Sequence, residues 1–261
     1  MIHPTCVISK SAKIDKSSSI GPFCIIGDNV EIGKNNNLIS HVSIVGNTII
    51  KDNNTFYPFS SIGSKPQDLK YKNEESFVII GNGNTFRENV TVNPGTQGGG
   101  LKTIIKDSCL FMVGSHIAHD CKIGSNIVFA NNATLAGHIT IDDNAIIGGN
   151  SAVHQFVRIG KFAMIGGMSG VEKDIIPYGL YTGIRESLKS LNLIGLKRKG
   201  LMSNTINEIK ILIKIIFDKT NTIENNIKNH IVQNSDILEI KEVIEFLNSN
   251  SKRGIATFKN D

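Results

Sequence analysis

The stretch IGSNIVFANNATLAGHITIDDNAIIGG, residues 123–149, carries a large apolar residue at every sixth position. The same step runs along most of the chain, with one shift of register by a single residue after the glycine-rich stretch 93–102. Its members are Ile2, Ile8, Ile14, Ile20, Ile26, Ile32, Leu38, Ile44, Ile50, Phe56, Ile62, Ile80, Phe86, Val92, Ile105, Phe111, Ile117, Ile123, Phe129, Leu135, Ile141, Ile147, Val153, Ile159, Ile165 and Val171. Helices repeat every 3.6 residues and half-buried strands every two, so neither produces this pattern. A six-residue unit, called a hexad here, does: a short strand turns one residue inward, and the chain then bends.

Small residues recur four places after these apolar sites, where they suit a tight wall. They include Cys6, Ala12, Ser18, Cys24, Ser60, Cys109, Ser115, Cys121, Ala133, Ala145, Ser151, Ala163 and Ser169. Glycine and asparagine often flank the apolar sites, as expected where bends need positive φ. All four cysteines fall in these positions, so we interpret them as compact wall residues rather than as zinc ligands or nucleophiles.

This pattern resembles the hexapeptide-repeat family of left-handed parallel β-helices over about residues 1–177. The resemblance implies three faces per coil, so that one turn of the helix takes three hexads. It also implies left-handed winding, an exception to the usual right-handed crossover. The fold class that we predict is mainly β, with a β-helix domain over residues 1–185 and a C-terminal helical domain over residues 186–261.

Helical spacing replaces the hexads in the C-terminal part. The stretch 203–219 carries one apolar stripe, formed by Ile206, Ile209, Leu212, Ile213 and Ile216. Thr222 and Ser235 are expected to cap two further helices. A solenoid needs a closed end, so a helical cap is the natural interpretation, and we expect the residues after Ser249 to fray.

The bulk composition is that of an ordinary globular protein, with 261 residues of which 40% are hydrophobic and 20% charged. The net charge of +5 is modest, and the one short basic cluster, LKRKG at 196–200, does not make the basic face of a nucleic-acid-binding protein. The chain holds no apolar run of the ~18–20 residues needed to cross a bilayer and begins with no secretory signal. Four cysteines then fit a reducing cytoplasm.

Four of the seven histidines converge if one coil takes three hexads. His119, His138 and His154 each follow an inward apolar site by one to three positions, and successive sites of this set lie three hexads apart. His116 borders the same strip. A single histidine on the outer wall of a β-helix is unremarkable. Three histidines from three successive coils, aligned beside Asp120, indicate a functional cluster.

Two kinds of chemistry suit this cluster. A zinc site needs three or four converging ligands, and the gamma-class carbonic anhydrases of the same repeat family are metal-dependent lyases. Their paired ligands stand five apart, whereas His116 and His119 are three apart. Alternatively, an unliganded imidazole acts as general base near neutral pH. Asp120 would then orient His119, which requires His119 to lie at a corner, because neighbours on a strand point to opposite faces.

Several short segments sharpen the resemblance. HIAHDC, ANNATLAGH, AIIGG, AVHQF, QDLKY (67–71), NPGTQGGG and GLKR are similar to those of the UDP-N-acetylglucosamine O-acyltransferases, which start lipid A synthesis, and the similarity is colinear to about residue 200. It implies transfer of a 3-hydroxyacyl chain from acyl carrier protein to the 3-hydroxyl of UDP-N-acetylglucosamine. It also implies a homotrimer with its sites between prisms and no cofactor. The related N-acyltransferases carry an extra N-terminal domain, whereas the hexads here begin at Ile2.

The resemblance assigns roles residue by residue. His119 is the general base, Asp120 its orienting partner, and the backbone N–H of Gly137 the donor to the oxyanion. The substrate-binding set that it implies is Gln67, Asp68, Lys70, His116, His138, His154, Gln155, Asn192 and Arg198, with Lys70 best suited to phosphate and the last two at the nucleotide end. The acyl-chain groove that it implies is formed by Met164, Gly167 and Arg185.

Two positions depart from the family pattern. Ile194 stands where an acidic residue is expected at the nucleotide end, and Arg185 stands where a histidine limits acyl-chain length. The preferred chain length therefore stays open, as does the choice between a 3-hydroxyl and a 3-amino acceptor sugar. A long loop, 64–78, interrupts the hexads without disturbing their phase, and such insertions are more often functional than not.

Overall fold

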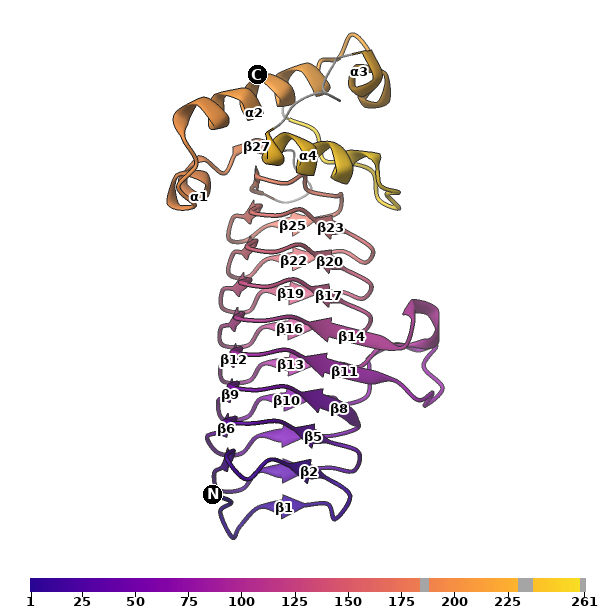
Figure 1. The fold of residues 1–261 in the computed structure, drawn as a ribbon. Coiled ribbons are helices and arrows are strands. Elements are labelled where there is room, and N and C mark those ends of the chain that lie inside the picture. Colours follow the sequence, from indigo (N-terminus) through magenta and orange to yellow (C-terminus); the bar gives the residue numbers. More distant parts are fainter. Residues whose placement is uncertain (184–187, 230–236, 259–261) are drawn as a thin grey trace.

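The computed structural model describes residues 1–183, 188–229 and 237–258. Stacked coils form a long prism with a group of helices at its C-terminal end (Figure 1). Each coil contributes short strands to three sheets, named A, B and C here, one on each face of the prism. All pairs of the described strands are parallel except the last pair of sheet A, so the predicted β-helix is confirmed.

The strands follow one another around the prism in the order B, C, A. Sheet B contains β1 (Val7–Ile8), β4 (Ile25–Ile26), β7 (Ser43–Ile44), β10 (Ser61–Ile62), β13 (Thr91–Val92), β16 (His116–Ile117), β19 (Thr134–Leu135), β22 (Ala152–Val153) and β25 (Gly170–Val171). Sheet C contains β2 (Lys13–Ile14), β5 (Glu31–Ile32), β8 (Asn47–Ile50), β11 (Phe77–Ile80), β14 (Lys102–Ile105), β17 (Lys122–Ile123), β20 (Thr140–Ile141) and β23 (Arg158–Ile159). Sheet A contains β3 (Ser19–Ile20), β6 (Asn37–Leu38), β9 (Thr55–Phe56), β12 (Thr85–Phe86), β15 (Leu110–Phe111), β18 (Val128–Phe129), β21 (Ile146–Ile147), β24 (Met164–Ile165), β26 (Gly179–Tyr181) and β27 (Leu188–Leu191).

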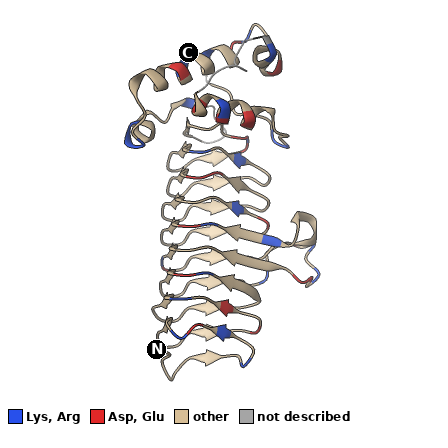
Figure 2. Cartoon of the chain, in the orientation of Figure 1, with Lys and Arg blue, Asp and Glu red and all other residues tan. Residues whose placement is uncertain are grey.

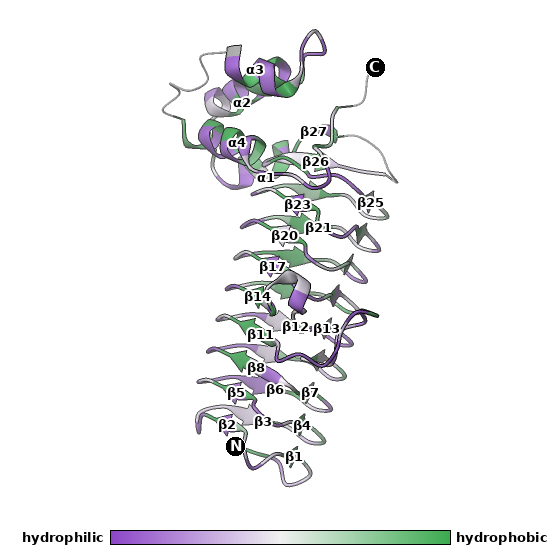
Figure 3. Cartoon of the chain, turned by 90° about the vertical axis from the view of Figure 1, so that its right-hand side faces the viewer, coloured by the Kyte–Doolittle hydropathy of each residue, from purple (hydrophilic) through white to green (hydrophobic). Residues whose placement is uncertain are grey.

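The register of the sheets fixes which residues stack. In sheet B, His116 pairs with Thr134, and Thr134 with Ala152, so each circuit takes three hexads there, as predicted. Two excursions lengthen single circuits, residues 64–76 between β10 and β11 and residues 93–101 between β13 and β14. Both leave the wall where sheet B turns into sheet C, which we call the B–C corner. Figure 1 shows them standing off the prism beside β11 and β14, and Figure 3 shows that the first is mainly hydrophilic.

The interior is built from the hexad positions. From Ile20 to Val171 every predicted inward residue is buried, while those of the first coil are more exposed because no coil lies below them. Phenylalanines 56, 86, 111 and 129 stack along the axis with ring centroids 4.8–5.1 Å apart. The predicted small residues from Ser18 onward are buried, and asparagines at eight corners adopt positive φ.

Four helices in the described part of the chain close the C-terminal end. They are α1 (Leu193–Arg198), α2 (Ser203–Ile216), α3 (Ile223–Asn229) and α4 (Leu238–Asn248). The predicted apolar stripe of α2 is buried. Thr222 caps α3, because its Oγ1 accepts a hydrogen bond from Asn225 N at 3.2 Å. Ser235 lies outside the described residues.

The prediction that the chain frays after Ser249 is wrong. Residues 255 and 258 form parallel bridges to residues 174 and 188, and Ala256 is buried. Asp174 N donates to Gly254 O, and Ala256 N donates to Asp174 O. The last coil has an open edge of unpaired backbone groups that need partners, and the tail supplies them. Strand β27 likewise continues sheet A beyond residue 185, the predicted domain boundary.

In Figure 2 the positions of basic and acidic residues are scattered along the prism and over the helices rather than gathered in one segment. None of the helices in the described part of the chain combines the length and the apolarity that a membrane crossing requires.

Candidate active site

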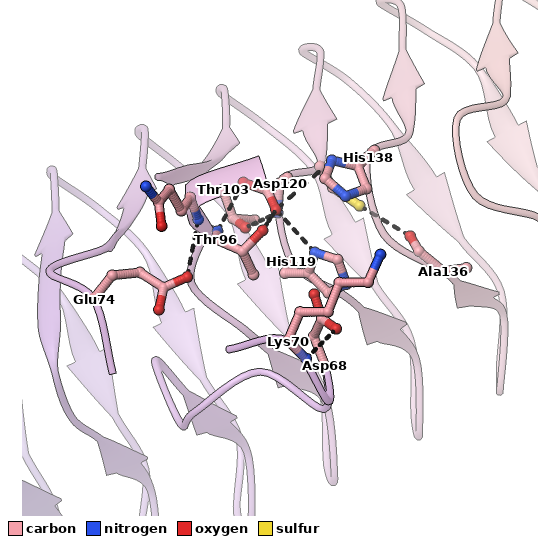
Figure 4. Close-up of polar contacts among 11 residues, drawn as sticks. Asp68, Lys70, Glu74, Thr96, Thr103, His119, Asp120, Ala136 and His138 are labelled. Atoms are coloured by element: carbon pink, nitrogen blue, oxygen red, sulfur yellow. Dashed lines mark hydrogen bonds and ion pairs between the residues drawn. The ribbon is translucent and has the colours of Figure 1, made fainter. Parts of the chain in front are cut away.

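His119 and Asp120 lie at the B–C corner between β16 and β17. Asp120 has a φ of 61°, so the chain bends there instead of continuing as a strand. The bend brings the two neighbouring side chains together, with Nδ1 of His119 2.8 Å from Oδ2 of Asp120 (Figure 4). The condition that His119 lie at a corner is therefore met.

The carboxylate of Asp120 is fully buried. Its Oδ1 accepts from Thr96 N at 2.9 Å, and its Oδ2 accepts from Thr96 Oγ1 at 2.6 Å. Burial raises the pKa of Asp120, but the hydrogen bonds from His119 and Thr96 outweigh it, so that the pKa lies below its ordinary value. Asp120 is thus ionised at neutral pH and can only accept hydrogen bonds.

This charge state fixes the tautomer of His119. Because an ionised carboxylate is acceptor-only, Nδ1 of neutral His119 carries the proton, and Nε2 keeps the lone pair. The His119 side chain is 7% exposed, so little water competes for that lone pair. This arrangement would suit a general base, with Nε2 as the atom that accepts the proton.

Gly137 lies directly above His119 in the next coil. A Cβ atom added there would be 2.3 Å from Cε1 and 2.6 Å from Nε2 of His119, so only glycine allows this approach. In the part of the chain that the structure describes, no protein group accepts the N–H of Gly137. A backbone donor thus stands beside the reacting nitrogen, as an oxyanion site requires.

His138 meets His119 edge to face, with ring centroids 4.9 Å apart. Its other side stacks on Phe156 at 4.5 Å, and Nζ of Lys252 lies 4.6 Å from the centre of that phenylalanine ring. Burial lowers the pKa of His138; Asp120 and Asp68 oppose this shift, while His119 and Lys252 add to it. The net pKa lies below the ordinary value, so His138 is neutral at pH 7.

Removing the Lys252 charge is expected to raise the pKa of His138. The Lys252→Met variant keeps an apolar side chain over Phe156 but takes away the cation that disfavours protonation. An NMR titration of the imidazole signals measures the shift. Lys10→Met, at the far end of the prism, is the control and should leave the titration unchanged. An unchanged or lower pKa in Lys252→Met would contradict the expectation.

The excursion 64–76 brings further predicted residues to this corner. Figure 4 shows Asp68 and Lys70 beside His119. Asp68 Oδ1 accepts from the backbone N–H of Lys70 at 2.9 Å, while Gln67 and Lys70 are exposed. His116 is held by a contact of 2.7 Å between its Nδ1 and Thr91 Oγ1, and burial lowers its pKa.

His154 and Gln155 lie at the same corner, one coil above His138 and two coils above His119, and both are exposed. The Nδ1 atom of His154 is 3.4 Å from the backbone oxygen of Gln155. The structure therefore brings the predicted histidine strip together at one corner. Phe156, which stacks on His138, was not predicted from the sequence. Phe156 stands three hexads after His138, so counting hexads along the sequence would have placed it at this corner.

A metal site would use the same side chains. Among the described residues, one group of three offers donor atoms within 4.8 Å of one another, namely His119, Asp120 and His138. A metal would have to displace the hydrogen bonds that Asp120 receives from His119 and Thr96. The metal-dependent alternative stays a prediction, which the metal content of the purified protein tests.

The cysteines take no part in this site. All four are free thiols. Burial raises the pKa of Cys109 to about 11 and that of Cys121 to about 12, so both remain protonated at neutral pH. Their positions agree with the interpretation of wall residues.

The nucleotide-end and acyl-groove residues lie elsewhere on the prism. A cavity of about 870 Å³ opens on the outer side of sheet A beneath α1, and Met164, Asn192, Ile194 and Arg198 line it. Asn192 also caps α1, since its Oδ1 accepts from Gly195 N at 3.0 Å. Gly167 is exposed at the turn after β24, outside the lining, and Arg185 lies outside the described residues.

Comparisons with known proteins identify the family. A family model for "Udp N-acetylglucosamine O-acyltransferase; Domain 2" matches residues 174–256, and one for bacterial transferase hexapeptides matches residues 102–137. Acyl-[acyl-carrier-protein]–UDP-N-acetylglucosamine O-acyltransferases from Thermodesulfovibrio yellowstonii and Rickettsia canadensis are 50% and 49% identical, covering 97% and 99% of this chain and 98% of each relative.

Solved structures of relatives share the fold of this chain. A crystal structure of a UDP-N-acetylglucosamine acyltransferase aligns with a TM-score of 0.95 at 41% identity, covering all of both chains. That from Francisella novicida aligns with a TM-score of 0.94 at 38% identity, covering 100% of this chain and 95% of its own. The chain therefore belongs to the UDP-N-acetylglucosamine O-acyltransferase family of hexapeptide-repeat proteins.

Proposed function

We propose that this chain transfers a 3-hydroxyacyl group from acyl carrier protein to the 3-hydroxyl of UDP-N-acetylglucosamine, the first step of lipid A biosynthesis. The observation that carries the proposal is the pair of His119 and ionised Asp120 at a buried corner, with Nε2 beside the backbone of Gly137. The names of the relatives supply the substrates.

The reaction follows from these atoms. Nε2 of His119 takes the proton from the sugar hydroxyl as its oxygen attacks the thioester carbonyl. The Gly137 N–H stabilises the oxyanion of the tetrahedral intermediate. Its collapse breaks the carbon–sulfur bond, and the His119 imidazolium returns the proton to the leaving thiolate. The buried Asp120 charge stabilises that imidazolium while it exists, so no cofactor is needed.

The surrounding polar residues suit a sugar nucleotide. We propose that Gln67, Asp68 and His138 bind the glucosamine unit and that the exposed ammonium of Lys70 binds the diphosphate. His116, His154 and Gln155 complete the polar wall. Asn192 and Arg198 receive the nucleotide end, and Met164, Gly167 and Arg185 the acyl chain. Ile194 is exposed in the cavity lining, so an apolar contact replaces the acidic one.

The separation of these two groups favours a site shared between copies of the chain, and the family resemblance implies that the copies form a homotrimer. The base lies at the B–C corner, whereas the cavity with Asn192 and Arg198 opens on sheet A of the same chain. A shared site then needs sheet A of a second copy facing the B–C corner of the first. Light scattering on the eluting protein is expected to give three times the chain mass of 28.4 kDa. A monomer with full activity would contradict the shared site.

An assay with the purified protein tests the function directly. UDP-N-acetylglucosamine and a panel of 3-hydroxyacyl carrier proteins are expected to give product at one or more chain lengths, without added metal. The 3-amino sugar nucleotide serves as the competing acceptor. Product formed only from an amino acceptor would favour amide formation instead, and loss of activity with a chelator would favour the metal-dependent alternative.

The four free cysteines fit a cytoplasmic enzyme.

A further inference from the structure

Asp120 faces two imidazoles with one carboxylate. Its Oδ2 is 2.8 Å from Nδ1 of His119 and 3.7 Å from Nδ1 of His138. A modest rotation of the carboxylate would exchange the partners. Only the first arrangement holds His119 in the tautomer whose Nε2 faces Gly137. Some feature of the fold must therefore decide which histidine the carboxylate orients.

Thr96 is placed to make that choice. It is 4% exposed, and it holds the carboxylate at both oxygens, through its N–H on Oδ1 and its hydroxyl on Oδ2. Two donors on two oxygens define both the position and the rotation of a planar group. Asp120 N in turn donates to Thr103 Oγ1 at 2.9 Å, which fixes the corner itself.

The short helix η1 (Gln97–Gly99) lies directly against the same carboxylate. A Cβ atom at Gly99 would stand 2.0 Å from Cγ of Asp120, so glycine is needed for this approach. On its other side Gln97 N donates to Glu74 Oε1 at 2.9 Å, which ties the segment to the loop that carries Asp68 and Lys70. The excursion 93–101 is thus anchored on both sides.

We propose that Thr96 is a positioning residue that directs Asp120 to His119 rather than to His138. The excursion 93–101 exists, in this interpretation, to deliver one hydroxyl and one N–H to a buried carboxylate. The expected effect of Thr96 on kcat rests on the proposed acyl transfer. Which imidazole Asp120 contacts can be measured in the protein without substrate. The two parts are therefore separately testable.

The test compares Thr96→Val with Thr96→Ser. Valine keeps the shape and the backbone donor but lacks the hydroxyl, and serine restores it. The nitrogen signals of ¹⁵N-labelled histidine report the tautomer of each imidazole in the full chain, and His138→Gln assigns them. We expect Thr96→Val to lower the fraction of His119 protonated at Nδ1 and to raise that fraction in His138. Thr96→Ser should keep the original spectrum.

Kinetics provides the second readout. Thr96→Val is expected to lower kcat roughly ten-fold, the usual size of effect for one charge-assisted hydrogen bond, with KM within about two-fold. Thr96→Ser should recover most of the lost kcat. If Thr96→Val does not fold, as its thermal melting would show, Thr96→Ala replaces it with the same expected results.

An unchanged His119 tautomer in the valine variant would overturn the proposal, as would a serine variant as impaired as valine. If the unaltered protein transfers no acyl group to any acceptor, the proposed function fails instead. The tautomer measurement then still decides the role of Thr96, because it uses no substrate.

Discussion

Replacing His119 with alanine is expected to lower kcat by at least about 100-fold, as loss of a positioned general base usually does. Nε2 of this imidazole carries the free lone pair because Nδ1 is held by the ionised Asp120. In the proposed reaction, the sugar hydroxyl would then lack the group that takes its proton. Initial rates at saturating concentrations of both substrates measure the change.

His3→Ala serves as the control for that experiment, because His3 is exposed in the first coil, far from the cluster. It should leave kcat within about two-fold, the range of an inert surface substitution. A loss of only two-fold in His119→Ala itself would mean that another group is the base.

Replacing Gly137 with alanine should lower kcat/KM by more than about 100-fold, the size of effect that a displacement of reacting groups by about 1 Å produces. The added methyl would lie 2.3 Å from Cε1 of His119, closer than atoms can approach, so that the ring must move. In the proposed reaction, the same methyl would also crowd the oxyanion next to the Gly137 N–H. Steady-state kinetics on both substrates measures the loss.

Gly98→Ala is the matched control, since a Cβ there meets nothing within 4 Å although the residue lies in the neighbouring excursion. Its kinetics should match those of the unaltered protein. Thermal melting of both variants separates a displaced base from a damaged prism. Full activity in Gly137→Ala would show that the close approach to His119 is not required.

The wall of the prism was predictable because its repeat is uniform. The step of six residues identified the inward positions, and the three-hexad circuit placed His119, His138 and His154 at one corner. The inward positions needed only counting, whereas the three-hexad circuit was implied by the resemblance to the hexapeptide-repeat family. The strand register confirms that circuit. The sequence could not show that Asp120 contacts His119, because neighbours on a strand point to opposite faces. The structure shows that the chain bends at Asp120, which brings the two side chains together.

Residues beyond the uniform repeat were not predictable in the same way. Thr96 stands 24 positions before Asp120, and the excursion that carries it breaks the regular count of hexads. Lys252 reaches Phe156 from a tail that lacks any repeat and was expected to fray. Contacts between a regular wall and an irregular segment depend on the path of that segment, which no period encodes.

The two excursions also determine where this protein can change in length. Within the wall, one inserted residue between His119 and His138 would push the second imidazole off its corner, because successive coils must stay in step. In residues 64–76 the added chain would simply lengthen a segment that leaves the prism and returns to it. The fold therefore allows the loop carrying Asp68 and Lys70 to be remodelled for a different acceptor while the base beneath it stays in place.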